Sequence, residues 1–244
     1  MLDCWTETFP LRFMAIDRSD RLTLGAVCDY FQEAAINHAE LLGIGRRVMA
    51  ETGRVWMLSR MSVVLESRPK YREPITVRTW CRGWEKLFAR RGYDIRDASG
   101  APLVRGAGAW LILDTARRRP LRPQSAVESL PQNETMDVLP GGAAGLEPQE
   151  GLSKIGERTA RYSDVDFNGH VNNTRYIQWI QDIMEPGLLE QADRMRLDIN
   201  YLSETKTGEV TELLTAQAGA GSLAVEGRRQ VSGQPVFRAE LRIF

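Results

Sequence analysis

The sequence predicts an α+β fold of two tandem units, each a long helix packed on a curved antiparallel sheet. Three observations predict this fold. Apolar residues repeat with a helical period in each half of the chain, segments of alternating period follow each helix, and the same order of elements occurs twice. A stretch rich in proline and glycine, without a sustained period, separates the two halves. It is expected to be a surface crossover.

The first half opens with a predicted helix over residues 24–42, whose apolar residues lie on one side. Thr23 can cap the start of this helix and Gly43 its end. Strands are predicted next, at residues 55–65, 75–81, 88–96 and 103–113. Residues 97–100 form the turn between the last two of these strands.

The second half repeats this order. A helical face runs from Asn173 to Met184, and Pro186 is expected to end that helix. Strands are predicted at residues 195–202, 210–218, 222–231 and 235–244, with a turn at 232–234. Two such units joined by a linker predict a pair of hotdog units side by side, in which each can cover an edge strand of the other. The predicted boundaries are 1–115 for the first hotdog unit, 116–155 for the linker and 156–244 for the second unit.

The two halves can be overlaid on their helices. Residues 30–32 (Tyr-Phe-Gln) match residues 176–178 (Tyr-Ile-Gln) at a spacing of 146 residues. At this spacing Asp20 lies over Asp166, but Leu22 and Leu24 occupy the places of Asn168 and His170. The first unit is therefore expected to lack the polar side chains that the second unit has at these positions.

Composition excludes several classes of function. Lys plus Arg and Asp plus Glu both number 32, which argues against a nucleic-acid partner. The first residues lack the pattern of a secretory signal, and the longest apolar run, residues 107–113, is too short to span a bilayer. Three cysteines and two histidines provide no spacing typical of a disulfide framework or a metal site. We expect a cytoplasmic protein with no membrane association, no metal and no cofactor.

One segment carries a candidate active site. Asp166, Asn168 and His170 alternate, so in an extended stretch all three side chains would face the same side. Gly169 allows the chain to turn into a helix that begins near Asn172, where unpaired amides can hold a developing oxyanion. Taken singly, each of these residues also fits a structural role in a turn or cap. Their combination favours catalysis.

The run from Asp166 to Ile177 (DFNGHVNNTRYI) resembles the signature of plant and bacterial acyl-acyl-carrier-protein (acyl-ACP) thioesterases. Residues 9–45 also resemble the first unit of that family. The resemblance implies two hotdog units and hydrolysis of fatty acyl-ACP to free fatty acid and holo-ACP, within fatty acid biosynthesis. It also implies that Asp, Asn and His of this run act with a Glu about 34 residues beyond the His, which here is Glu204. Plant members carry a Cys after that Glu, whereas this chain has Thr205, so water is the expected nucleophile.

The expected mechanism assigns a role to each residue. Glu204 and His170 would position and deprotonate a water molecule, while Asp166 would orient the imidazole. Asn168 would donate its amide to the carbonyl oxygen of the thioester. Which of Asp166 and Glu204 is the base stays open. The first unit, which is expected to lack these polar catalytic groups, would bind the acyl chain, and the second unit would be catalytic.

Three alternative functions are left open. An acyl-coenzyme A thioesterase would use the same residues. A hotdog enoyl-thioester hydratase would use an Asp-x-Asn-Pro-x-His segment, but His170 stands four residues after Asp166, and no proline follows Asn168. A non-catalytic acyl-binding module is the third alternative.

The resemblance also implies partners. These are an acidic acyl carrier protein that carries the acyl-phosphopantetheine group, and the fatty acyl chain itself, while a homodimer is left open. Basic side chains could meet the carrier electrostatically. Candidate clusters are Arg117–Arg119 with Arg122, Arg46–Arg47 and Arg90–Arg91.

Overall fold

The computed structural model describes residues 3–127, 130–133, 135–136 and 139–244. The first half contains β1 (Cys4–Pro10), β2 (Arg54–Leu65), β3 (Pro74–Glu85), β4 (Phe88–Arg96), β5 (Pro102–Asp114) and β6 (Arg119–Leu121), with α1 (Leu24–Leu41), α2 (Arg46–Glu51) and α3 (Pro123–Ala126). The second half contains β7 (Ser153–Thr159), β8 (Met195–Tyr201), β9 (Val210–Gly219), β10 (Ser222–Arg229) and β11 (Pro235–Ile243), with α4 (Asn173–Asp182) and α5 (Pro186–Gln191).

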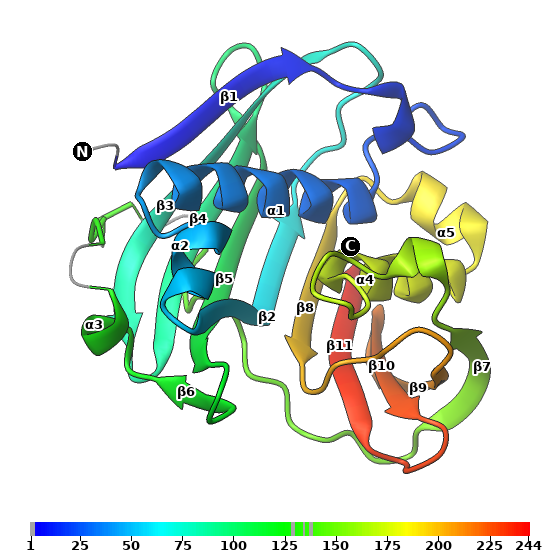
Figure 1. Ribbon diagram of the computed structural model, residues 1–244. Helices are drawn as coiled ribbons and strands as arrows, with labels where there is room; N and C mark the ends of the chain where they lie inside the picture. The colour runs from blue at the N-terminus through cyan, green and yellow to red at the C-terminus, as the bar shows by residue number, and fades with distance from the viewer. Residues whose placement is uncertain (1–2, 128–129, 134, 137–138) are drawn as a thin grey trace.

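The strands form one antiparallel sheet in the order β1-β3-β4-β5-β2-β8-β11-β10-β9-β7, with β6 paired to β5. Each half contributes five strands of this order in the same relative positions, so β1 corresponds to β7 and β2 to β8. The two halves meet where β2 pairs with β8, from Arg60 opposite Asn200 to Leu65 opposite Met195. The predicted α+β fold, with a long helix on an antiparallel sheet in each of two hotdog units, is confirmed (Figure 1).

Both long helices cover the same face of the sheet, with α1 in front of the first half and α4 in front of the second (Figure 1). In the first unit Phe31 is fully buried and stacks on Tyr93, with 4.7 Å between the ring centroids. In the second unit Tyr176 packs on Phe237 at 5.3 Å. The helices contact each other, and the Gly25 amide donates to Gln181 Oε1 at 2.8 Å.

The predicted linker is partly structured. Within residues 116–155, β6 and α3 lie before the crossover, and β7 begins at Ser153. Asn200 secures the crossover to the sheet, because its side chain accepts from the Leu146 amide and donates to the Ala144 carbonyl, both at 2.8 Å. Residues 128–129, 134 and 137–138 lie outside the described residues. The division at 115 and 156 stays a prediction.

Pro186 was predicted to end the second long helix, which does end at Asp182, but the proline itself begins the short helix α5. Proline fits the first turn of a helix because its missing amide would have no partner there. None of the helices in the described part of the chain combines the length and apolar character needed to cross a membrane.

A substitution at Gly106 on β5 can test how tightly α1 packs on the sheet. A Cβ atom at Gly106 would lie 2.5 Å from the Phe31 ring, whereas a Cβ atom at Gly156 on β7 would meet nothing within 4 Å. We expect Gly106→Ala to lower the free energy of unfolding by about 1–3 kcal/mol because the buried ring must move. Gly156→Ala, the matched control, should leave it unchanged or raise it slightly. Urea unfolding of both variants measures the difference, and equal stabilities would contradict this packing.

Candidate active site

The loop before α4 is a tight reversal that returns the chain onto the helix. The short 3-10 turn Tyr162–Asp164 precedes it, and Val165 pairs with Val171 in an isolated antiparallel bridge. The Asp166 amide donates to the His170 carbonyl at 3.0 Å, and Gly169 has a positive φ of 80°. This reversal places the side chains of residues 166–170 at the start of α4.

His170 and Glu204 meet at this loop. The His170 Nε2 atom lies 3.0 Å from Glu204 Oε2, and the two side chains are 27% and 45% exposed. The Val171 amide donates to the Thr205 carbonyl at 2.8 Å, which fastens the segment that carries Glu204 beside the imidazole. The structure thus joins the imidazole to the carboxylate that lies 34 residues further along the chain.

Asp166 and Asn168 form a second pair. The Asp166 carboxylate accepts from the Asn168 amide at 2.8 Å, and the Asn168 side-chain nitrogen lies 3.5 Å from its other oxygen. Asp166 bonds to His170 through the backbone only, so the expected contact between this carboxylate and the imidazole does not form among the described contacts. The reason is the reversal at Gly169, since the three side chains would share a side only in an extended strand. Glu204 takes the place beside the imidazole.

The start of α4 is already capped. Asn172 is the N-cap residue, and its side-chain oxygen accepts from the Thr174 amide at 3.0 Å. The Arg175 amide donates to the Asn172 carbonyl at 2.9 Å. Both amides therefore already have hydrogen-bond partners at the helix start. Fewer free amides are left to bind an oxyanion there than the sequence predicts.

Thr205 is turned into the protein. Its side chain is 1% exposed and lies beside Tyr176, which is also buried. Burial raises the pKa of Tyr176 to about 12, against a smaller opposing effect of the Thr205 side chain. A hydroxyl enclosed in this way is poorly placed to attack a substrate, in agreement with the expectation that water is the nucleophile.

No group of three or more His, Cys, Asp or Glu side chains is placed to hold a metal ion in the part of the chain that the structure describes. At the loop itself the structure brings together the His170 imidazole, the Glu204 and Asp166 carboxylates and the Asn168 amide.

The first unit reaches the candidate site through α2. The Arg46 guanidinium stacks on the ring of Phe167, 4.3 Å from its centroid, and Arg47 beside it is 86% exposed. Arg117–Arg119 and Arg122 are exposed near β6. Arg91, in contrast, is buried and bonds to His38 Nδ1 at 2.9 Å, so its proposed place in a docking surface is wrong.

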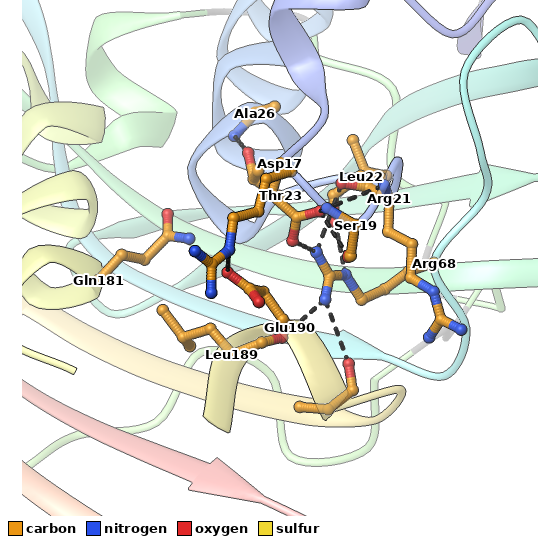
Figure 2. A network of polar contacts seen from close by, with 12 residues as sticks. Asp17, Ser19, Arg21, Leu22, Thr23, Ala26, Arg68, Gln181, Leu189 and Glu190 are labelled. Atoms are coloured by element: carbon orange, nitrogen blue, oxygen red, sulfur yellow. Dashed lines mark hydrogen bonds and ion pairs between the residues drawn. The ribbon is translucent and has the colours of Figure 1, made fainter. Parts of the chain in front are cut away.

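A second copy of the loop lies before α1 (Figure 2). Ile16 pairs with Leu22 as Val165 pairs with Val171. The Asp17 amide donates to the Arg21 carbonyl at 2.9 Å, and Asp20 has a positive φ of 63°. The two loops therefore share one backbone arrangement.

The matching residues of the two loops are 149 residues apart, not 146. Asp17, Ser19 and Arg21 correspond to Asp166, Asn168 and His170. The overlay at a spacing of 146 residues is therefore wrong by three residues. Three residues are close to one helical turn, so that overlay still matches apolar residues of the two helices. The sequence holds a signal that gives the correct spacing. In Ile16-Asp17 and in Val165-Asp166 an apolar residue precedes an aspartate, and another apolar residue follows five positions after that aspartate.

Arg68 occupies the position of Glu204 in this copy. The Leu22 amide donates to the Pro69 carbonyl at 3.0 Å as the Val171 amide donates to the Thr205 carbonyl, which makes the preceding residues equivalent. The loop of the first unit therefore holds polar side chains where the overlay had placed leucines, and they form an ion pair between buried Arg68 and Asp17, whose side chain is 20% exposed (Figure 2). The expectation that this unit lacks the polar catalytic groups stays a prediction.

Arg68 also joins the two units. Its Nη1 atom donates to the carbonyls of Leu189 and Ala192, at the end of α5, at 2.7 and 3.3 Å. Burial alone would raise the pKa of Asp17, but the hydrogen bond from Ser19 and the charge of Arg68 outweigh it and leave that pKa below its ordinary value. Ion pairs from Arg18 to Glu190 and from Arg21 to Asp193 close the same loop against the second unit.

Two family models match the chain. The model of the acyl-ACP thioesterase N-terminal domain matches residues 3–128, and the model of the C-terminal domain of the same family matches residues 149–238. Together they cover most of the chain, including every predicted site residue.

Individual proteins named as acyl carrier protein thioesterases are also similar to this chain. A palmitoyl-acyl carrier protein thioesterase from Arabidopsis thaliana is 28% identical over 91% of this chain and 57% of the relative. The chain spans about half the length of such curated relatives. The crystal structure of an acyl-ACP thioesterase from Bacteroides thetaiotaomicron is 25% identical, covers 99% of this chain and 98% of its own, and superposes with a TM-score of 0.84. A 12:0-ACP thioesterase from Umbellularia californica, 22% identical, covers 98% of this chain and 96% of its own at a TM-score of 0.78 and shares the fold.

We expect Arg68→Met to lower the free energy of unfolding by roughly 3–5 kcal/mol, because it leaves the Asp17 charge and several carbonyls of a buried site unpaired. The matched control Arg18→Met removes a guanidinium that is 74% exposed and should change the free energy of unfolding much less. Denaturant unfolding at pH 7 measures both.

The pH dependence of the Arg68→Met effect identifies the ion pair. Because the pKa of Asp17 is lowered in the folded state, the pair contributes stability above the unfolded-state value of about 4 and loses it as the pH falls through the folded value. The difference between wild type and Arg68→Met should therefore shrink at acidic pH. A difference that stays constant down to the acid transition would argue against the pair.

Proposed function

The chain belongs to the acyl-ACP thioesterase family, and from this premise we propose that it hydrolyses fatty acyl-ACP to free fatty acid and holo-ACP. One observation carries the proposal, namely the contact of 3.0 Å between His170 Nε2 and Glu204 Oε2 at an open loop that also presents Asn168. An imidazole coupled to a carboxylate is a general base suited to neutral pH.

Water is the nucleophile in the proposed reaction. One Glu204 oxygen contacts the imidazole, and the half-exposed side chain leaves the other accessible to a water molecule. Glu204 and His170 take a proton from this water as its oxygen attacks the thioester carbonyl carbon. The tetrahedral intermediate then expels the thiolate of the carrier, which receives the proton from His170, so that a carboxylic acid and a thiol are formed.

Asn168 is the proposed donor to the oxyanion. Its backbone amide is held by Asp166, while its side-chain nitrogen, at 3.5 Å from that carboxylate, is only weakly engaged. This exposed amide can donate to the carbonyl oxygen as negative charge develops there, a contribution of about 3–4 kcal/mol for one well-placed donor. Asp166 accordingly positions Asn168, and Glu204 positions the imidazole.

The acyl chain is proposed to lie in the first unit. The four polar residues of the reaction belong to the second unit, and the equivalent loop of the first unit is closed by the Asp17–Arg68 pair. A cytoplasmic location is likewise our proposal, supported by three cysteines that are all free. Acyl-coenzyme A is the alternative substrate, and the thiol-release assay below compares the two carriers.

We expect Glu204→Gln to lower kcat at least 100-fold, because the amide can neither accept the proton of the water nor charge the imidazole. Asp166→Asn, which acts through Asn168, should lower kcat about tenfold or more. Glu185→Gln, a change at an exposed glutamate of the same unit, serves as the control. The measurement is thiol release from purified acyl-ACP and acyl-coenzyme A. Near-normal turnover in both variants would end the proposal.

Arg46 and Arg47 are the proposed contact for the acidic carrier, because Arg46 stacks on Phe167 within the catalytic loop. Replacing both with alanine should raise KM for acyl-ACP about fivefold, or roughly 1 kcal/mol, and more at low than at high salt. The same change should affect acyl-coenzyme A less. Replacement of Arg117 and Arg118 is the matched comparison. An equal effect on both carriers would assign Arg46 and Arg47 another role.

A further inference from the structure

Glu204 depends on its backbone for its position. It lies between β8 and β9, in residues 202–209, which form no helix or strand, and its side chain is 45% exposed. Packing around the Glu204 side chain cannot by itself fix the carboxylate against the imidazole, because an exposed glutamate samples several rotamers. The contacts that hold the segment must therefore place the carboxylate.

Contacts on both sides of Glu204 hold this segment. The amides of Leu202 and Ser203 donate to the Val236 carbonyl at 2.8 and 3.1 Å, and the Thr205 carbonyl accepts from the Val171 amide. The carbonyl of Glu204 itself accepts from Arg229 Nη2 at 2.5 Å. Of these, the contact with Arg229 is made directly by the glutamate.

Arg229, at the end of β10, is itself held in place. Its Nη1 atom donates to Gln234 Oε1 at 2.9 Å, and its Nε atom lies 3.4 Å from Glu209 Oε2. Glu209 also accepts from the Lys206 amide at 2.9 Å, so the guanidinium connects both ends of the segment 204–209. The arginine side chain is 24% exposed, which makes it a firmer support than the glutamate.

Among the described residues of the first unit, no contact equivalent to that of Arg229 with the Glu204 carbonyl is formed. There the Leu103 carbonyl accepts from the amides of Glu66 and Ser67, just as Val236 accepts from Leu202 and Ser203, so Arg68 is again the equivalent of Glu204.

The residue equivalent to Arg229 is Asp97. Its amide donates to the Ala101 carbonyl at 3.0 Å, as the Arg229 amide donates to the Gln234 carbonyl at 2.9 Å. The Asp97 carboxylate accepts from the amides of Ser99 and Ala101 and stays within its own turn. The arginine thus occurs in the copy that keeps the catalytic carboxylate, and the copy without that carboxylate has an aspartate.

We propose that Arg229 is a positioning residue that holds Glu204 against His170. This inference rests on the proposed function, because it assigns Arg229 a role through Glu204. Arg229 takes no part in proton transfer. It fixes the backbone carbonyl from which the glutamate side chain extends, and displacement of a catalytic group by about 1 Å can slow a reaction about 100-fold.

Arg229→Met keeps much of the side-chain stem but removes the donor. We expect kcat to fall about 10- to 100-fold while KM changes less than about twofold, because the substrate contacts are untouched. Arg229→Lys should recover part of the loss. Arg242→Met, at a half-exposed arginine of β11 paired with Glu240, is the matched control and should keep wild-type turnover.

The double variant separates positioning from general damage. In a Glu204→Gln background, Arg229→Met should lower kcat by less than about twofold, because the group through which it acts is already lost. A loss as large as in the wild-type background would overturn the inference, and so would wild-type kcat for Arg229→Met.

A measurement without substrate keeps the inference testable even if the proposed hydrolysis fails. The chain has two histidines, so the imidazole nitrogen resonances of His170 can be followed by NMR with buried His38 as an internal reference. Arg229→Met should move the His170 Nε2 resonance in the same direction as Glu204→Gln does, with His38 unchanged. A His170 resonance that coincides with wild type would show that Arg229 does not hold the glutamate, whatever the activity.

Discussion

The pairing of β2 with β8 is the constraint on which the rest of the molecule depends. It joins two sheets into one, and the buried pair Ser62–Asp198 lies within it. With this joint in place, α1 and α4 lie next to each other on one face, and each loop that precedes a long helix meets a short helix of the other unit. The candidate site is therefore built on a rigid sheet, although its own residues lie in loops.

The two loops show how one backbone supports opposite electrostatics. In the second unit a carboxylate at position 204 faces an imidazole and remains partly open to solvent. In the first unit the Arg68 guanidinium is bonded to Asp17, to the Leu22 carbonyl and to two carbonyls of the other unit, and its side chain is 2% exposed. The charge at this one position therefore differs in sign between the two copies, and in the first copy it joins the two units, whereas in the second it belongs to the candidate active site. The reactive copy instead needs support for its exposed carboxylate, which Arg229 and the Thr205 segment supply.

Most of the sheet could be predicted from the sequence, because its central strands are largely buried apolar segments bounded by turn residues. Strands β2, β4, β5 and β8 begin and end within one or two residues of the predicted ranges. The outer strands β1 and β7 escaped prediction, since edge strands with several exposed residues carry little alternation. Asp166, Asn168 and His170 were predicted from their spacing and from the family resemblance, and Glu204 from the resemblance. The roles of Arg68 and Arg229 were not predicted, because they depend on contacts between segments far apart in the sequence. Such contacts follow from the packing of whole elements, which periodicity does not encode.

Because Arg46 contacts Phe167, residues from both halves of the chain surround the candidate catalytic loop. A chimera that combines halves of two related thioesterases would change the surroundings of its catalytic centre even if each half kept its own fold. The substrate specificity of such a chimera would then depend on the contacts between its two halves as well as on the pocket that was exchanged.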